Sequence, residues 1–368
     1  MKILITGSNG FIAKNLISHL NRDKNIKLYL YSKEDSTDIL EAYVKECDFI
    51  FHLAGVNRPT NIDEFYSGNI DLTKFIVKVL KDNTKSTPIL FSSSTQVKED
   101  NDYAKSKLEA ENILIDYSKE MNTNIYIYRL PNVFGKWSRP NYNTVIATWC
   151  YNINNNIDIE ISNKDTILDL VYIDDVIKAF MDKLSKLDDI TIFYKIDNIY
   201  QKSLGEIKTL LYLFKENRET LFMPNVSEGF NKGLYATYLS FLPKDNFSYP
   251  LKGHQDERGT FYEIVKSSNG GQCSLSTTTP NIKRGGHFHH TKNEKFLVVK
   301  GKALIQLRDI LNEEIIEYRV SDEKMEIVEM IPGYTHNIKN IGDEELILFI
   351  WANENYDSNN PDTYYLEV

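Results

Sequence analysis

The chain has 368 residues, with 43 Lys and Arg against 52 Asp and Glu and a formal charge of −9. Hydrophobic residues make up 42% and charged residues 26%, as is ordinary for a globular protein. This length predicts two domains. The acidic balance argues against a nucleic-acid partner, because phosphate binding needs a basic surface. No apolar run reaches bilayer-spanning length, so we expect no membrane insertion.

The N-terminus and the cysteines indicate a cellular compartment. Residues 1–5 run directly into a glycine-bearing turn, without the apolar stretch and cleavage site of a signal peptide. The three cysteines, Cys47, Cys150 and Cys273, are widely scattered and have neither metal-ligand nor disulfide spacing. We therefore expect a cytoplasmic protein.

The first 20 residues predict a strand, a tight turn and a helix that together bind a nucleotide. Residues 2–6 form a β-branched run, and Ile12, Leu16 and Leu20 recur at helical spacing after the turn. Glycines in such a turn let the backbone approach a pyrophosphate, and the helix N-terminus offers amide donors to it. The predicted cofactor-binding residues here are Gly7, Asn9, Gly10, Phe11 and Ile12.

The end of the second predicted strand, residues 27–31, bears on the choice of cofactor. In a dinucleotide fold this point meets the adenosine ribose, where an acidic residue would bind the 2′-hydroxyl and repel a 2′-phosphate. This chain has Ser32 and Lys33 there, with Glu34 and Asp35 close behind. The sequence thus favours NADPH over NADH, with Ser32 and Lys33 as cofactor-binding residues.

Three further elements continue the alternation of strands and helices. A buried strand over 48–52 runs into Leu53, Ala54 and Gly55, where the backbone could pass under a cofactor. Residues 61–82 have the apolar spacing of a helix. The next strand, 88–91, ends in three serines and Thr95.

Tyr103 and Lys107 are the candidate catalytic pair of this half of the chain. Residues four apart on a helix lie on one face, one turn from each other. The ammonium can then stabilise a phenolate and lower the pKa of the tyrosine toward working pH, as proton exchange with a carbonyl or hydroxyl requires. By itself this spacing more often marks a solvated helix face, so the interpretation depends on context.

The motifs taken together supply that context, because residues 1–240 resemble an extended short-chain dehydrogenase/reductase acting on nucleotide sugars. The resemblance implies a Rossmann-type, doubly wound parallel sheet, Tyr103 as proton donor or acceptor, and Lys107 as the residue that binds the nicotinamide ribose. It implies that Ser94, or Thr95, orients the substrate oxygen, and that Asn132 contacts substrate. The matching segments are Thr6-Gly-x-x-Gly-Phe-Ile12, His52-Leu-Ala-Gly55, Phe91-Ser-Ser-Ser94, Tyr103-x-x-x-Lys107, Arg129-Leu-Pro-Asn-Val-Phe-Gly135 and Leu170-Val-Tyr-Ile-Asp-Asp175. The departure is Gln96-Val97-Lys98-Glu99, where many relatives have Val-Tyr-Gly.

A change of pattern marks the second domain. Residues 243–250 contain two prolines and turn formers without apolar periodicity, which predicts a linker. Beyond it, short strands alternate with glycine, asparagine and aspartate turns. We predict a reductase domain over 1–242, a linker over 243–251 and an all-β domain over 252–368.

Histidines gather in two segments of the predicted all-β domain. His287, His289 and His290 fall within four positions, followed by Glu294, and His336 comes later in the chain. Imidazole and carboxylate groups on separate strands suggest a divalent metal inside a barrel. Strand alternation puts His287 and His289 on one face and His290 on the other, unless the strand is bulged.

These segments resemble the two motifs of the cupin jelly-roll barrels. A second resemblance is to the deoxysugar 3,5-epimerases, and two segments carry it: Asp256-x-Arg-Gly-x-Phe-x-Glu263 and Arg284-Gly-x-His287. The resemblance implies that His287 is the base that removes a proton next to a sugar ketone. It leaves His290, Glu294 and His336 as the metal ligands, with His289 as the alternate ligand. Zinc is the metal that suits these donors best, and nickel, iron and manganese are alternatives. The other hypothesis is a barrel that binds no metal.

The order of reductase then cupin resembles the bifunctional enzymes of capsular polysaccharide synthesis. The resemblance implies C3 epimerisation of a UDP-2-acetamido-2,6-dideoxy-4-hexulose in the cupin domain, followed by NADPH-dependent C4 reduction. The product would be UDP-2-acetamido-2,6-dideoxy-L-talose, a precursor of N-acetyl-L-fucosamine, and a homodimer is expected. The alternatives are a single-function reductase whose cupin binds substrate or dimerises, and a sensor without chemistry, which would not need Tyr103 and Lys107.

Overall fold

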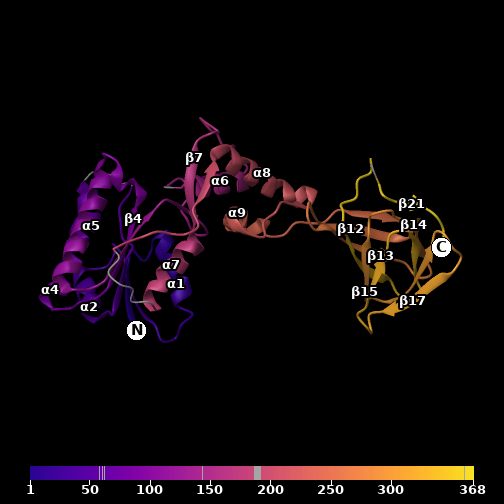
Figure 1. Ribbon diagram of the computed structural model, residues 1–368, viewed down its shortest axis with the longest axis horizontal. Coiled ribbons are helices and arrows are strands. Elements are labelled where there is room, and N and C mark those ends of the chain that lie inside the picture. The colour runs from indigo at the N-terminus through magenta and orange to yellow at the C-terminus, as the bar shows by residue number, and fades with distance from the viewer. Residues whose placement is uncertain (58, 60, 62, 143, 186–191, 360) are drawn as a thin grey trace. The chain divides into compact units, whose positions relative to one another are not determined.

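The structure is a computed structural model that describes residues 1–57, 59, 61, 63–142, 144–185, 192–359 and 361–368 (Figure 1). The chain divides into two compact units, described separately below. They are Met1–Leu211 with Gly229–Pro243, and Tyr212–Glu228 with Lys244–Val368. Within the described ranges, no helix combines the length and the apolar character needed to cross a bilayer.

A parallel sheet forms the centre of the first unit. Its six strands lie in the order β2-β1-β3-β4-β5-β8. Both faces of the sheet are covered, so its inner strands β1, β3, β4 and β5 are nearly continuous runs of buried residues. The bounds are β1 Lys2–Thr6, β2 Lys27–Tyr31, β3 Phe49–His52, β4 Ile89–Ser94, β5 Ile125–Leu130 and β8 Phe193–Tyr194.

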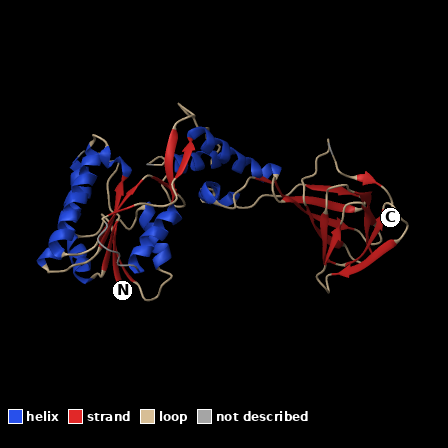
Figure 2. Cartoon of the chain, in the orientation of Figure 1, coloured by secondary structure: helices blue, strands red, loops and turns tan. Residues whose placement is uncertain are grey.

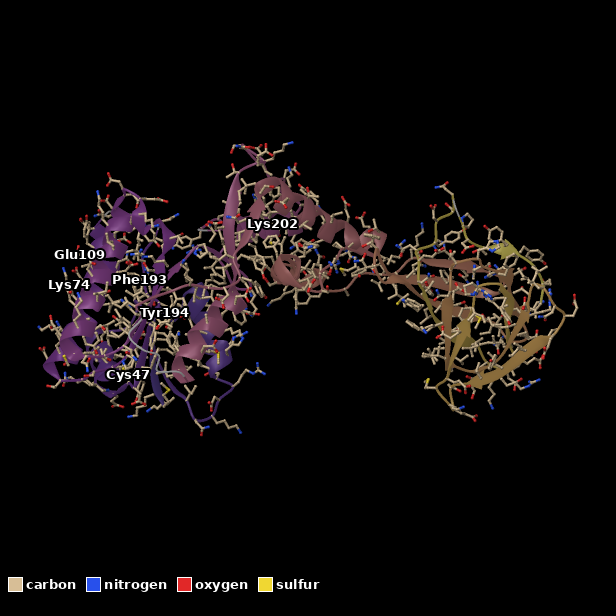
Figure 3. All side chains as sticks on the ribbon, viewed as in Figure 1. Cys47, Lys74, Glu109, Phe193, Tyr194 and Lys202 are labelled. Carbon is tan, nitrogen blue, oxygen red and sulfur yellow. The ribbon has the colours of Figure 1, made fainter. Side chains whose placement is uncertain are left out.

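Helices cover both faces of this sheet, as predicted for a doubly wound fold (Figure 2). One face packs on α2 (Thr37–Glu46), α4 (Leu72–Asp82) and α5 (Asp102–Met121). The other packs on α1 (Phe11–Leu20) and α7 (Ile173–Ser185). Lys74 of α4 and Glu109 of α5, labelled in Figure 3, join the two helices through an ion pair with an Nζ–Oε1 distance of 3.1 Å.

The helix predicted over 61–82 is interrupted. Its described part consists of α3 (Asp63–Phe65), a π-helical turn η1 (Tyr66–Asp71) and then α4. The π-turn carries Asn69, whose Oδ1 accepts a hydrogen bond from the Val56 amide at 2.8 Å and whose Nδ2 donates to the Val56 carbonyl at 3.0 Å. A widened turn that presents one side chain to a neighbouring loop is a common position for a functional residue.

The rest of the first unit is a smaller layer beside the main sheet. A three-stranded sheet in the order β6-β7-β9 lies with helices α6 and α9, which contact each other. The bounds in this part of the chain are η2 Thr95–Lys98, β6 Asn132–Phe134, α6 Val145–Asn154, β7 Ile167–Tyr172, β9 Tyr200–Ser203, α8 Leu204–Thr220 and α9 Gly229–Leu239.

The second unit consists of two sheets around one apolar core, as predicted for a cupin barrel. One sheet has the order β10-β12-β13-β20-β15-β18, with β11 paired to β12, and the other has the order β17-β16-β19-β14-β21. Phe296, Ile305 and Met330 are among the core residues. The bounds are β10 Phe222–Met223, η3 Lys244–Asn246, β11 Gly253–Asp256, β12 Gly259–Ser267, β13 Gly271–Thr278, β14 Lys283–Phe288, β15 Glu294–Lys300, β16 Lys302–Asp309, β17 Ile315–Ser321, β18 Ile327–Met330, β19 Tyr334–Asn340, β20 Leu346–Ala352 and β21 Tyr364–Tyr365.

The division between the units differs from the predicted boundary at 242. Residues 212–228 lie in the second unit, because β10 forms a parallel pair with β12. The predicted linker lies there too from Lys244 onward, and the Arg218 guanidinium is 4.5 Å from the centre of the Tyr249 ring. This pairing is non-local, and no local sequence pattern marks it.

Candidate functional site

The glycine-bearing turn after β1 has the geometry of a phosphate-binding loop. The Gly10 amide donates to the Gly7 carbonyl at 2.8 Å, and Gly10 caps α1 without a side-chain hydrogen bond, so the first amides of the helix stay available. Gly7 has a φ of +68°, and a Cβ there would lie 2.7 Å from Ala54 Cα. Only glycine fits this close approach of β1 to the loop after β3.

A cleft of about 1200 Å³ lies along the turn and the carboxyl ends of the parallel strands. Open parallel sheets bind ligands at this edge. Most predicted cofactor and catalytic residues of the first unit line the cleft: Gly7, Asn9, Gly10, Phe11, Ile12, Leu53, Gly55, Ser94, Tyr103 and Lys107. Thr95 and Asn132, predicted to face substrate, line it too. Lys14, Trp137 and Arg139 also line it, although the sequence analysis did not select them.

Three predicted cofactor residues lie outside the lining of this cleft. Ala54 packs its backbone against Gly7 instead. The Ser32 amide and hydroxyl both donate to the Asp35 carboxylate, at 2.7 and 2.9 Å, and Lys33 is exposed beside it. Their selection of a 2′-phosphate stays a prediction.

Tyr103 lies in the first turn of α5, directly behind the Asn101 cap, whose side chain accepts from the Ala104 amide at 2.8 Å. Burial raises the pKa of Tyr103, and a hydrogen bond with Ser94 partly offsets the rise. Ser94, the residue predicted to orient substrate, thus opposes the rise, and the lowering of this pKa by Lys107 stays a prediction.

Lys107 lies deep in the cleft. Its Nζ donates to the Ser92 carbonyl at 3.0 Å and is 4.7 Å from the centre of the Phe91 ring. Burial lowers the pKa of Lys107 to about 8, and the Glu111 carboxylate one turn further along α5 opposes this shift. A lysine poised in this way can hold a ribose hydroxyl and exchange a proton through it.

Two sets of side chains that support this pair carried no signal in the sequence. Asn69 Nδ2 donates to Ser106 Oγ at 2.9 Å, which ties the π-turn to the catalytic helix. Glu111 accepts from Arg129 Nε at 3.0 Å and Nη2 at 2.6 Å. These residues come from η1, α5 and β5, so only the fold brings them together.

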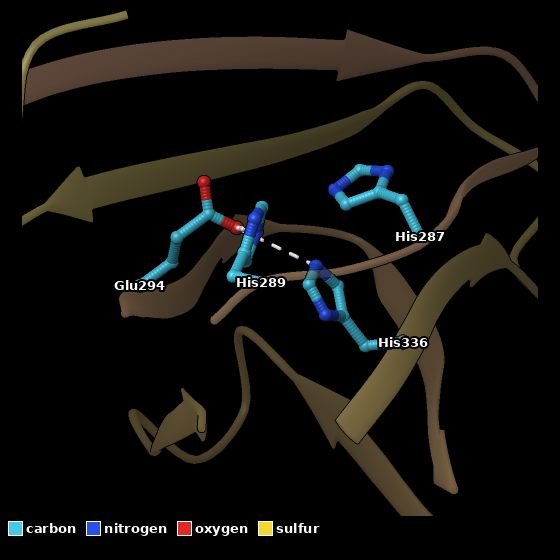
Figure 4. Close-up of side chains that lie close together, drawn as sticks. All are labelled: His287, His289, Glu294 and His336. Atoms are coloured by element: carbon cyan, nitrogen blue, oxygen red, sulfur yellow. Dashed lines mark ion pairs between the residues drawn. The ribbon is translucent and has the colours of Figure 1, made fainter. Parts of the chain in front are cut away.

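A cluster in the second unit brings together four of the predicted histidine and glutamate residues (Figure 4). One ligand atom from each of His287, His289, Glu294 and His336 lies within 4.8 Å of all the others. They come from β14 and the residue after it, the start of β15, and β19. Burial alone would raise the pKa of Glu294, but the imidazoles of His289 and His336 hold it well below its usual range.

His290, a predicted ligand, is not part of this cluster, whereas the predicted alternate His289 is, and the identity of the metal ligands stays a prediction. The His290 ring is exposed and packs against Phe288 and Tyr364. The alternate, His289, points inward with 1% of its surface exposed. The alternation of strand residues had already placed His287 and His289 on one face and His290 on the other.

The donor atoms fit a divalent metal. His289 Nε2 and His336 Nε2 each lie 3.5 Å from Glu294 Oε2, and both nitrogens are buried without a hydrogen-bond partner among the described residues. Two ligands about 2.0–2.1 Å from one tetrahedral zinc lie roughly 3.3 Å apart. Buried imidazole nitrogens without partners are costly unless a cation or a proton satisfies them. His287 is more exposed, and burial followed by the His336 charge lowers its pKa to about 4.

Comparisons with known proteins match both units. Residues 3–193 match the NAD dependent epimerase/dehydratase family, and residues 254–364 match the polysaccharide biosynthesis C-terminal domain. A solved structure of the capsular polysaccharide assembling protein CapF from Staphylococcus aureus is 44% identical, with a TM-score of 0.94 over 100% of both chains. The chain belongs to the CapF family.

Two other similar proteins extend the comparison beyond CapF. The UDP-2-acetamido-2,6-beta-L-arabino-hexul-4-ose reductase of Pseudomonas aeruginosa is 45% identical over 100% of this chain and 99% of its own. The UDP-glucuronic acid 4-epimerase of Bacillus cereus is 20% identical, with a TM-score of 0.53 over 58% of this chain and 84% of its own, and shares the fold alone. The full-length CapF match confirms the predicted fold class, a Rossmann-type reductase domain followed by a cupin domain.

Proposed function

We propose that the protein is a bifunctional nucleotide-sugar enzyme that epimerises a UDP-2-acetamido-2,6-dideoxy-4-hexulose at C3 and then reduces its C4 ketone with NADPH. The main support for the reductase activity is that Ser94, Tyr103 and Lys107 line one cleft, beside a turn that can bind a pyrophosphate. The full-length similarity to a reductase of the corresponding 4-ketosugar supports the same substrate class.

In the reduction step, NADPH bound along the cleft would supply a hydride for C4 of the sugar, and the carbonyl oxygen would gain negative charge. The Tyr103 hydroxyl gives its proton to that oxygen, which leaves an alcohol and NADP⁺. Ser94, which lowers the pKa of the phenol, holds the substrate oxygen beside it. Lys107 binds the nicotinamide ribose and stabilises the phenolate that remains.

In the epimerisation step, the second unit acts on the acidic C3 proton next to the ketone. His287, the most exposed of the four clustered side chains, takes that proton, and the electron pair moves to the C4 oxygen as an enolate. A proton from solvent then returns to the opposite face of C3. His289, Glu294 and His336 would hold a divalent ion, with zinc the best match, whose positive charge stabilises an enolate.

The two steps suit each other chemically. C3 can be inverted only while C4 is a ketone, because the carbonyl makes the C3 proton acidic. Reduction of C4 removes this acidity and fixes the new configuration. The proposed product is UDP-2-acetamido-2,6-dideoxy-L-talose, a precursor for capsular polysaccharide. The expected homodimer and cytoplasmic location stay predictions.

A second candidate is a reductase with a single function, whose cupin unit binds substrate or joins subunits. It is favoured by the name of the Pseudomonas relative, which mentions reduction alone. The two candidates differ in what His287 does: in a simple reductase this residue has no part in the stereochemistry.

Proton NMR of the 4-ketosugar in deuterated water, before and after NADPH is added, separates the candidates. We expect exchange at C3 before cofactor is present, and a reduced product afterwards. Tyr103→Phe should abolish NADPH oxidation and retain exchange, whereas His287→Asn should abolish exchange and retain bound metal. Reduction without any preceding exchange in the wild-type protein would leave the single-function reductase.

A further inference from the structure

The last residues of the chain contact the segment that joins the clustered histidines to Glu294. The Asp362 carboxylate accepts backbone hydrogen bonds from His290 at 2.9 Å, Thr291 at 2.7 Å and Lys292 at 2.8 Å. It also accepts from the Thr291 hydroxyl at 2.9 Å. One carboxylate thus holds three consecutive amides of the loop between His289 and Glu294.

The main-chain carbonyl of Asp362 determines which nitrogen of His289 can bind a metal. His289 Nδ1 lies 2.5 Å from this oxygen. Because a carbonyl only accepts, Nδ1 must carry the hydrogen, and the lone pair of the neutral ring lies on Nε2. Nε2 is the buried atom without a partner, 3.5 Å from Glu294 Oε2. Outer contacts of this kind fix the tautomer and orientation of metal-ligating histidines.

The segment that carries Asp362 is anchored at other points as well. β21 pairs with β14, and the Leu366 amide donates to the Gly286 carbonyl at 3.0 Å. Lys283 and Glu367 form an ion pair with an Nζ–Oε2 distance of 2.6 Å. The Thr335 hydroxyl, next to His336, donates to the Leu366 carbonyl. These contacts do not involve the Asp362 side chain, so its loss should leave the segment in place.

We propose that Asp362 is a positioning residue of the metal centre: its carboxylate fixes the 290–292 loop, and its carbonyl fixes the His289 tautomer. The inference rests on the proposed metal site in the second unit. It makes the C-terminal segment a part of that site in addition to an edge strand of the barrel. A segment that only closes the barrel would affect stability without changing metal affinity.

The test is the zinc affinity of the full-length protein after its metal is removed, measured by competition with a chromophoric chelator. Asp362→Ala should bind zinc about 10- to 100-fold more weakly than wild type. Asp357→Ala is the matched control, because Asp357 lies in the same part of the chain and accepts only from the Asn359 amide, at 2.9 Å, among the described contacts. Its zinc affinity should match that of wild type.

A second readout separates a change at the metal site from general unfolding of the variant. Cobalt(II) in place of zinc gives a visible spectrum that reports ligand geometry, and we expect Asp362→Ala to change it. Asp362→Asn, which keeps one acceptor oxygen, covers the case in which the alanine variant does not fold, and should bind zinc more weakly than wild type. Wild-type affinity and spectrum in the folded variant would overturn the role of Asp362. Absence of zinc binding by the wild-type protein would instead overturn the proposed metal site.

Discussion

Gly55→Ala is the most direct test of the position of Lys107. A Cβ added at Gly55 would lie 2.9 Å from Lys107 Nζ and 3.2 Å from Asn69 Oδ1. Ordinary contact begins at 3.4 Å, so Nζ must move by about 0.5 Å to reach it. Lys107 is a flexible side chain and can make this movement. The change therefore acts on the catalytic group more than on the fold.

The structure gives the size of the effect. The hydrogen bond from Lys107 Nζ to the Ser92 carbonyl is 3.0 Å long. If Nζ moves about 0.5 Å away from both Gly55 and this carbonyl, the hydrogen bond is lost. A hydrogen bond from a charged donor contributes about 1.5–3 kcal/mol. At about 1.4 kcal/mol for each tenfold change in rate, kcat/KM should fall by about 10- to 100-fold.

The assay is steady-state NADPH oxidation with the 4-ketosugar, together with thermal unfolding. The unfolding midpoint should fall by a few degrees, because the same hydrogen bond also contributes to stability, so rates are compared at a temperature at which both proteins are folded. The fall in rate should persist at saturating NADPH, which separates displacement of Lys107 from simple obstruction of the cofactor. Gly342→Ala is the control, since its Cβ would meet no atom closer than 3.5 Å. A Gly55→Ala enzyme within twofold of wild type would refute the placement of Lys107.

Three further predictions concern pH, cofactor and metal. Since the pKa of Lys107 is lowered to about 8, the kcat/KM for reduction should fall as pH rises through 8 and the ammonium is lost. Stability should instead rise over this range. Between pH 8 and the ordinary lysine pKa of 10.5, the unfolded chain binds more protons at Lys107 than the folded chain, so the contribution of Lys107 to the free energy of unfolding grows with pH. Unfolding free energies of wild type and Lys107→Met across this pH range measure it. Lys33→Ala should weaken NADPH binding far more than NADH binding in a fluorescence titration, and equal effects would remove Lys33 from the cofactor site. Zinc present at 1000-fold its Kd should stabilise the second unit by about 4 kcal/mol, and a chelator should abolish this gain without slowing reduction of epimerised substrate.

Local pattern accounts for most of the site in the first unit. The helical repeat puts Tyr103 and Lys107 on one face of α5, and the strand–turn–helix at the N-terminus follows from apolar spacing and glycine. The pKa of Tyr103 could not be derived in the same way, because it depends on burial and on Ser94 from another strand. Asn69, Glu111 and Arg129 likewise gain their roles through contacts between distant segments.

The sequence by itself determined the two fold classes, the glycine turn, the tyrosine–lysine pair and the presence of a histidine cluster. The glycine turn and the tyrosine–lysine pair rest on side-chain periodicity within a few residues, which the chain encodes locally, whereas the two fold classes were implied by the resemblance of its motifs to known families. Only the tertiary structure decided that His289 and not His290 faces Glu294, that β10 joins the second unit, and that Asp362 reaches the loop after His289. Each depends on which strands pair and which face is buried, and that is fixed by packing across the whole domain.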